Sequence, residues 1–221
     1  MAESDGRLAD ERGRESLAVG TLRNQESIPP KTPDPLARIH HVVITGGEPM
    51  LFRRVCELSA RLAAPADEGG TAMHVTIETA GTVIPEDRDW PLTCHLMSIS
   101  PKLSNSTPVN DARDPDGSWA RRHEDRRLNI PVIQSLIDRF SRSGSDCQLK
   151  FVVCRAGDLA EIDDLLARLR GWSPPDVLLM PEGVTPPSAP LKDLIADACL
   201  ARGFRYCPRL HIELFGNRRG T

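Results

Sequence analysis

Apolar residues along this chain follow two alternating patterns, short continuous runs and longer stretches with helical spacing. Short runs rich in β-branched and other apolar residues predict buried strands. They lie at 41–44, 73–77, 95–99, 148–153, 177–180 and 204–207. Apolar residues three or four positions apart predict amphipathic helices. These helices are expected at 49–64, 131–141, 158–170 and 191–202.

Local signals support the helix boundaries. Pro49 stands where a first helical residue is favoured, and the apolar face of that helix is expected to carry Leu51, Val55, Leu58 and Leu62. Asp158 and Glu161 have the spacing of a capping box, and Gly171 follows that helix. Strands that alternate with helices predict an α/β fold with a mostly parallel sheet and right-handed crossovers.

Two stretches lack apolar periodicity. Residues 1–37 are polar and charged, with four prolines near their end, and predict a disordered or weakly ordered lead-in. Residues 103–129 form a long polar insertion within the remaining domain, 38–221. We interpret the insertion either as a solvated surface segment or as a lid over a binding pocket, because loops of this length often have functions.

Composition narrows the class of protein. A chain of 221 residues is long enough for one domain with a full core. Its net charge of −3 gives no general attraction for nucleic acid or an anionic membrane. The sequence contains no run of about 18 apolar residues, so no membrane span is predicted. The acidic start has no apolar signal region, so we expect a cytoplasmic protein.

The spacing of the cysteines and histidines does not indicate a metal site or a catalytic site. The six cysteines include no Cys-x-x-Cys pair, and we expect reduced or buried thiols. The six histidines show no metal-ligand interval, and no nucleophile with a partnered base can be assigned. No catalytic residue and no metal ligand therefore follow from the spacing.

The informative residues come directly after predicted strands. They are Thr45–Glu48, Glu78–Gly81, Ser100–Lys102 and Pro181–Gly183. Parallel strands direct their carboxyl ends to one edge of a sheet, so these four corners are expected to meet at one binding face.

A zwitterionic ligand would suit this set of corners. Backbone groups at Gly46 and Gly47 can accept from an ammonium group, and Lys102 can pair with a carboxylate. The alternative is that Glu48 and Glu78 are structural, capping helices or pairing with Lys102 and a lysine at position 150.

Taken together, the corner sequences resemble those of the 7-carboxy-7-deazaguanine synthase family of radical S-adenosylmethionine enzymes. The resemblance covers about residues 38–221 in the family's order. The matching segments are HVVITGGEP at 41–49, TIETAGT at 76–82, MSISPKLSNSTP at 97–108, QLKFVV at 148–153, LMPEG at 179–183 and YCPRLHIELFGNRRGT at 206–221.

The resemblance implies an incomplete parallel β/α barrel that binds S-adenosylmethionine, a 4Fe-4S cluster and Mg2+. It implies a carbon–nitrogen lyase of queuosine biosynthesis that converts 6-carboxy-5,6,7,8-tetrahydropterin to 7-carboxy-7-deazaguanine. A homodimer is also implied. Carried over by residue, Thr45 would contact the pterin substrate. The residues implied for S-adenosylmethionine are Gly47, Ser100, Pro101, Lys102, Met180, Pro181, Glu182 and Gly183.

One part of the family pattern is absent. The family carries Cys-x-x-x-Cys-x-x-Cys followed by Asp-Thr ahead of Thr-Gly-Gly-Glu-Pro, whereas the first cysteine here is Cys56. The ligands of the cluster and of Mg2+ are therefore missing, and we expect this chain to be inactive alone. We interpret it as a family member whose front part was lost through a wrongly chosen start, a frameshift or a split gene.

Two other functions stay open. The chain is alternatively a non-catalytic remnant that binds S-adenosylmethionine or a purine. It is otherwise a generic phosphate-binding α/β protein, in which nucleotide binding would be unaffected by Lys102→Ala.

Overall fold

A computed structural model describes residues 39–87, 89–141 and 144–218 of the chain. His40–Thr221 forms one compact unit, to which the following description applies. The predicted lead-in at 1–37 lies outside the described residues.

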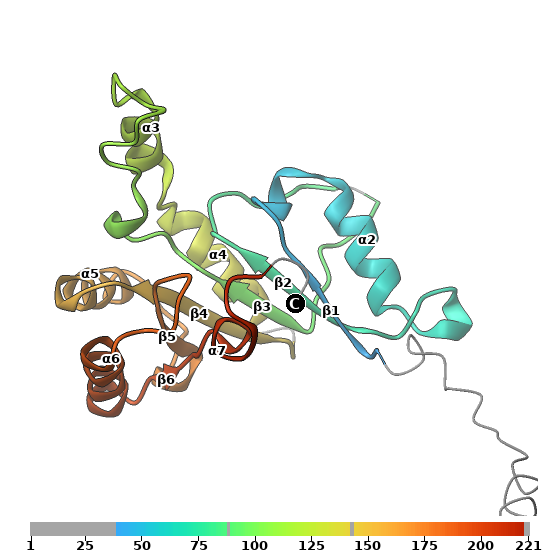
Figure 1. The fold of residues 1–221 in the computed structure, drawn as a ribbon. Helices are drawn as coiled ribbons and strands as arrows, with labels where there is room; N and C mark the ends of the chain where they lie inside the picture. Colours follow the sequence, from blue (N-terminus) through green and yellow to red (C-terminus); the bar gives the residue numbers. More distant parts are fainter. Residues whose placement is uncertain (1–38, 88, 142–143, 219–221) are drawn as a thin grey trace, which may run out of the picture. The chain divides into compact units, whose positions relative to one another are not determined.

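Six strands form a single parallel sheet whose spatial order follows the sequence (Figure 1). Each strand pairs in parallel with the next one along the chain. The prediction of an α/β fold with an incomplete parallel β/α barrel is confirmed. The strands are β1 (His41–Ile44), β2 (His74–Thr79), β3 (Leu96–Ile99), β4 (Asp146–Val153), β5 (Val177–Pro181) and β6 (Arg205–Tyr206).

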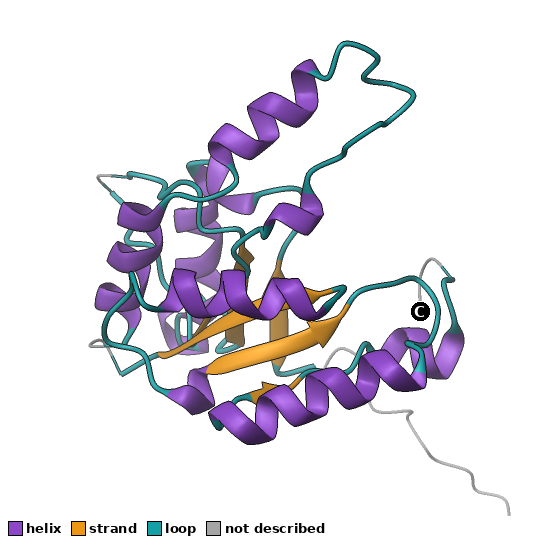
Figure 2. Ribbon diagram, turned by 90° about the vertical axis from the view of Figure 1, so that its left-hand side faces the viewer, coloured by secondary structure: helices purple, strands orange, loops and turns teal. Residues whose placement is uncertain are grey.

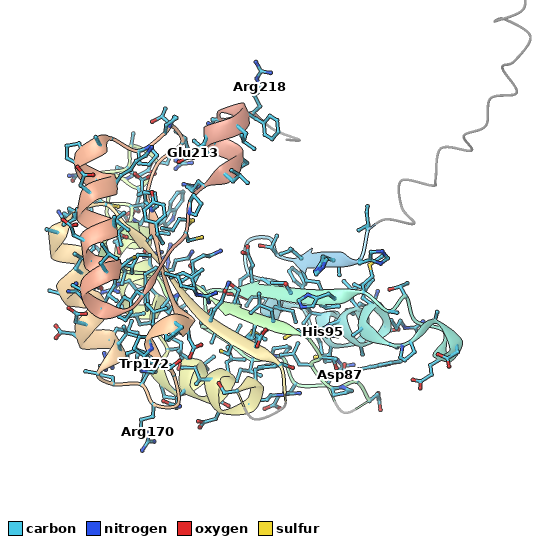
Figure 3. The ribbon with its side chains drawn as sticks, turned by 90° about the horizontal axis from the view of Figure 1, so that it is seen from below. Asp87, His95, Arg170, Trp172, Glu213 and Arg218 are labelled. Atoms are coloured by element: carbon cyan, nitrogen blue, oxygen red, sulfur yellow. The ribbon has the colours of Figure 1, made fainter. Side chains whose placement is uncertain are left out.

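Helices connect the strands and cover one face of the sheet. The helices that pack on strands are α2 (Arg54–Ala63), α4 (Ile130–Phe140), α5 (Ala156–Leu166) and α6 (Ala189–Arg202). The chain closes with α7 (Leu210–Phe215), and the short 3₁₀ turns are η2 (Pro49–Leu51), η3 (Ala66–Glu68), η4 (Ser104–Ser106) and η5 (Pro174–Asp176). In Figure 3 the tail residues Glu213 and Arg218 lie on one side of the sheet and Trp172 on the other.

The two faces of the sheet differ in chemistry. In each strand, alternate side chains point to opposite faces, and those facing the helices form the buried core. The core residues on the central strands are Val75, Ile77, Met97, Ile99, Leu149, Phe151, Val177 and Leu179. The registers place Thr76 beside Leu96 and Lys150 beside Leu178 on the opposite face. That face therefore carries polar and apolar side chains together, and we call it the open face.

The polar insertion at 103–129 contains secondary structure of its own. It includes η4 and a helix, α3 (Ser118–Arg126), which projects from the sheet together with the loop before it (Figures 1 and 2). Asp114 stabilises the start of this helix, because its carboxylate accepts hydrogen bonds from the backbone N–H groups of Trp119 and Ala120. The structure therefore describes an ordered arm in this region.

The first predicted helix was wrong in its start and in two of the four residues of its apolar face. The chain forms η2 and then, after Phe52 and Arg53, begins α2 at Arg54. Leu51 and Leu58 are 69% and 49% exposed, while Val55, Cys56 and Ser59 are buried. The break at Phe52, which has an extended backbone, turns the later residues away from the face that an unbroken helix would have had.

The capping prediction for the helix at 158–170 also needs correction. The helix begins at Ala156, Arg155 is its N-cap, and Asp158 is the third helical residue. The Asp158 carboxylate accepts from the backbone N–H groups of Cys154 and Arg155. Glu161 faces the polar insertion instead. In the part of the chain that the structure describes, no helix has both the length and the apolar character of a membrane span.

Candidate functional site

The parallel order of the sheet places the ends of all six strands at one edge. Thr45–Pro49 follow β1, Ala80–Gly81 follow β2, Ser100–Lys102 follow β3, and Glu182–Gly183 follow β5. The corners that the sequence singled out therefore lie at the same edge. In open α/β sheets this carboxyl edge is where ligands bind.

The Glu48 carboxylate links the corner after β1 to the corner after β2 by hydrogen bonds. Its carboxylate accepts a hydrogen bond from the Thr79 hydroxyl at 2.8 Å and from the backbone N–H of Ala80 at 2.8 Å. It also accepts from the backbone N–H of Met50 at 3.1 Å, which caps η2. The structural interpretation of Glu48 is confirmed, because its acceptor sites already serve three donors.

The two glycines of the first corner leave open space. Gly46 has a φ of +150°, which residues with a Cβ rarely adopt. A Cβ built on either Gly46 or Gly47 would meet no atom within 4 Å. A cavity of about 300 Å³ adjoins this corner, with Thr45, Gly47, Phe52 and Leu58 among its lining residues. The corner can therefore receive a ligand against its backbone.

An ion pair crosses the open face beside the first corner. Lys150 Nζ lies 2.7 Å from Glu78 Oε1, and the Thr45 hydroxyl donates to Glu78 Oε2 at 3.3 Å. The alternative that Glu78 pairs with Lys150 is thus confirmed. The neighbouring Ser98 hydroxyl, fully buried, accepts from the Gln148 side-chain amide at 2.9 Å. The open face is a network of paired polar groups, which suits a polar ligand rather than an apolar one.

The third corner carries a free cation. Among the described residues, the Lys102 ammonium has no ion-pair partner, unlike Lys150. A cavity of about 190 Å³ is lined by Pro101 and Lys102 from this corner and by Glu182 from the corner after β5. The cavity therefore combines an ammonium group and a carboxylate, which together match a ligand that carries both charges.

Buried hydrogen bonds hold the loop after Lys102 in place. The Asn105 side-chain amide donates to the Val152 carbonyl at 3.0 Å and to Asp158 at 2.8 Å. Asp158 is itself 2% exposed. Sequence reasoning assigned no role to Asn105, whose partners lie about 50 residues away, and gave Asp158 only a capping role.

The fourth corner is tied to the C-terminal tail. The backbone N–H of Glu182 donates to the Val153 carbonyl at 3.0 Å, and the Gly183 carbonyl accepts from Arg209 at 2.6 Å. Gly183 has a φ of +127°, a conformation that favours glycine. Arg209 is a second residue that the sequence analysis did not assign.

The predicted cofactor residues are divided between two cavities. Gly47 lines the one beside β1, while Pro101, Lys102 and Glu182 line the one between β3 and β5. Ser100, Met180, Pro181 and Gly183 lie at the same edge but are not among the residues lining these two cavities. Thr45 lies in the first cavity and contacts Glu78.

A larger cavity, of about 610 Å³, lies at the opposite edge of the sheet. Its lining includes Leu96, Asp146 and Asp176, at or just before the starts of β3, β4 and β5. None of the predicted site residues lines it. We place the candidate site at the carboxyl edge, because parallel sheets bind ligands there and because the unpaired Lys102 is there.

The cysteines do not form a metal centre. All six lie in the described part of the chain, and no three Cys, His, Asp or Glu residues of that part are grouped to hold a metal ion. Burial raises the pKa of the Cys94 and Cys147 thiols to about 12. Cluster irons require thiolate ligands, so the residues present do not fit a 4Fe-4S cluster.

Comparison with known proteins identifies the family. A protein from Halobacterium salinarum named 7-carboxy-7-deazaguanine synthase is 40% identical over 189 residues, which span 82% of this chain and 67% of the relative. The chain belongs to the 7-carboxy-7-deazaguanine synthase family. A relative of the same name from Rhodopirellula baltica is 40% identical over 184 residues, or 83% of this chain and 64% of that protein.

The family extends to a more distant relative. A 7-carboxy-7-deazaguanine synthase from Pyrobaculum aerophilum is 29% identical over 188 residues, 84% of this chain and 69% of that protein. The chain thus matches about two thirds of the length of these relatives. No family model matches the chain. No solved structure matches it either.

Proposed function

We propose that this chain binds S-adenosylmethionine and a carboxylated pterin at the carboxyl edge of its sheet, as part of the 7-carboxy-7-deazaguanine synthase reaction. That reaction is a carbon–nitrogen lyase step of queuosine biosynthesis, from 6-carboxy-5,6,7,8-tetrahydropterin to 7-carboxy-7-deazaguanine. The proposal rests on family membership and on one observation above all. This is Lys102, whose ammonium has no ion-pair partner in the described part of the chain and which lines a cavity together with Glu182.

The residues present fit the amino-acid part of S-adenosylmethionine. Lys102 would pair with its carboxylate, and backbone oxygens at Gly46 and Gly47 would accept from its ammonium group. Glu182 adds a negative charge to the Lys102 cavity. When bound, the cofactor would supply the reactive adenosyl group, while the protein would orient it and limit the access of water.

The pterin would bind on the open face beside the cofactor. Thr45 would contact it, as the family resemblance implies. Glu78 and Lys150 would offer an acceptor and a donor in a fixed geometry, since they already form a 2.7 Å pair. Family membership also keeps a homodimer among our predictions.

The chain does not supply what an iron–sulfur cluster and Mg2+ need. Its six thiols are dispersed and the pKa of each is raised, with burial as the largest cause. The same observation favours a second candidate function, a non-catalytic protein that binds S-adenosylmethionine or a purine. We propose that catalysis requires thiolate ligands other than these six.

Calorimetry with S-adenosylmethionine tests the binding proposal. The purified chain should bind the cofactor, and Lys102→Ala should weaken binding about tenfold or more, because it removes a charge-assisted pair of about 1.5–3 kcal/mol. Lys192→Ala is the control, since Lys192 on α6 lines neither of the two cavities and forms only a long pair with Glu213, at 3.9 Å. Equal affinities for the wild type and Lys102→Ala would contradict the proposal.

Two further experiments, an ATP titration and an iron–sulfide reconstitution, distinguish the candidate functions. ATP binding that Lys102→Ala leaves unchanged would favour a generic phosphate-binding protein. Anaerobic reconstitution with iron and sulfide should leave the chain without the absorbance of an iron–sulfur cluster. Incorporation of about four irons per chain would show that the dispersed thiols do hold one.

A further inference from the structure

A largely buried arginine joins the projecting arm to the loop after β3 and to α5. Arg127 is the C-cap of α3, and its side chain is 11% exposed. Arg121, Arg122 and Arg126 on the same helix are exposed. The arginines at the end of α3 therefore differ in exposure, because Arg127 is turned toward the body of the protein.

All three nitrogens of the Arg127 guanidinium donate hydrogen bonds. One terminal nitrogen donates to the Lys102 carbonyl at 2.9 Å and to Glu161 at 2.8 Å. The other terminal nitrogen and Nε donate to Glu124 at 2.7 Å and 2.8 Å. Hydrogen bonds between ionised groups at these lengths are the stronger ones in proteins.

Glu161 extends this network to the next turn of the same loop. Its carboxylate accepts from the Ser104 hydroxyl at 2.6 Å and from the Ser104 backbone N–H at 3.0 and 3.1 Å. Leu103, between the two anchored residues, is 2% exposed. The backbone is thus fixed on both sides of Leu103, while the Lys102 ammonium has no ion-pair partner among the described residues.

Glu124 connects the network to the arm. It accepts from the Thr107 hydroxyl at 2.8 Å, and Thr107 also lies 3.1 Å from the His123 ring. One face of α3 therefore contacts the loop that begins at Lys102. A shift of the arm would move the carbonyl to which Arg127 is bonded.

We propose that Arg127 is a positioning residue for Lys102, linking the projecting arm to the cofactor corner through the Lys102 carbonyl and Glu161. This inference rests on the proposed role of Lys102 in binding the cofactor carboxylate. Arg127 fixes the backbone carbonyl of Lys102, and so the part of the chain from which the ammonium group extends. Its role in the proposal is to position Lys102 and not to contact cofactor or substrate.

Arg127→Gln tests the inference, with Arg126→Gln as the matched control one residue away on the exposed side of the helix. Hydrogen exchange of the ligand-free proteins should be faster at residues 100–107 in Arg127→Gln and unchanged in Arg126→Gln. S-adenosylmethionine affinity should fall about tenfold in Arg127→Gln only, the size of a typical coupling between sites. Arg127→Lys keeps the charge but not the forked geometry and should restore part of that loss.

The outcomes distinguish positioning from general stability and from failure of the proposed function. Unchanged exchange at 100–107 in Arg127→Gln overturns the inference, and so does faster exchange spread over all strands. If the wild type does not bind S-adenosylmethionine, the proposed function fails, while exchange at 100–107 still decides whether Arg127 holds the loop. Should Arg127→Gln not fold, Glu161→Gln removes the second anchor, and unchanged exchange at Ser104 there overturns the inference.

Discussion

Replacing Glu48 should destabilise the ligand-free protein, although the residue belongs to the Thr-Gly-Gly-Glu-Pro segment at the candidate site. Its carboxylate satisfies the Thr79 hydroxyl and the Ala80 and Met50 backbone N–H groups. Thr79 is 3% exposed, so water cannot replace the lost acceptor freely. Leaving a buried donor unsatisfied costs about 1–3 kcal/mol. With donors on two buried residues and one partly buried residue, we expect Glu48→Ala to lose about 3 kcal/mol of the free energy of unfolding.

Glu48→Gln gives a more selective measurement. An amide oxygen in the position of Oε1 keeps the bonds to Met50 and Thr79, but the amide nitrogen then faces the N–H of Ala80. The expected loss is about 1–2 kcal/mol, the cost of one unsatisfied buried donor. Urea unfolding at neutral pH measures both variants, and a shift of the midpoint without a change of slope identifies a stability effect.

Glu57→Ala is the control for this pair. Glu57 forms an exposed pair with Arg61 on α2, four residues apart, so its removal should cost about 0.5 kcal/mol or less. If Glu48→Ala loses no more than Glu57→Ala, the three hydrogen bonds do not stabilise the fold. The carboxylate would then be available to a ligand, and our structural account of the corner would be refuted.

Two further predictions concern thiols and glycines. Burial raises the pKa of Cys94 and Cys147 from 9.0 to about 12. Between these two values the unfolded state releases the thiol protons while the folded state keeps them. The contribution of the two thiols to the free energy of unfolding should therefore be complete below pH 9 and decrease as the pH rises toward 12. A Cys94→Ala/Cys147→Ala variant should lose less of its stability over that window in a urea titration, and an equal loss would contradict the prediction. Gly81→Ala should cost about 2 kcal/mol or more, because φ is +72° and the new Cβ would lie 2.8 Å from Ile133. Gly157→Ala, in helix α5 with no atom within 4 Å, should stabilise by about 0.5–1 kcal/mol, and thermal unfolding of both variants checks the sign.

Sequence patterns predicted the strands well, because β-branched runs such as His41–Ile44 depend mainly on local composition. The predicted helix at 49–64 was correct over 54–63 but wrong in its first turn, for a reason outside its own window. Glu48 caps Met50 while bonding Thr79 and Ala80, over 30 residues away, and η2 forms in place of a first helical turn. A pattern of apolar positions contains no information on such partners.

The location of the candidate site was predictable from the sequence, but the hydrogen bonds and ion pairs that hold it were not. Corner residues such as Lys102 were identified because parallel strands share an edge, which follows from the order of elements alone. The bond between Arg127 and Glu161 could not be predicted, since it spans 34 residues and joins the end of α3 to α5. In the sequence, Arg127 was one of five basic residues in a polar segment, and only the fold shows that it is buried.

The division of the sheet into a buried apolar face and an open face of mixed polarity has a consequence for how this protein can change. Thr76, Gln148 and Leu178 lie on the side away from the helices, and the core side chains Ile77, Leu149 and Leu179 lie next to them in sequence on the other. Substitutions on the first side leave the packed core intact and cost little stability, except where they break the Glu78–Lys150 or Gln148–Ser98 pair. Single amino-acid substitutions on the open face can therefore change which ligand the protein prefers without changing its fold.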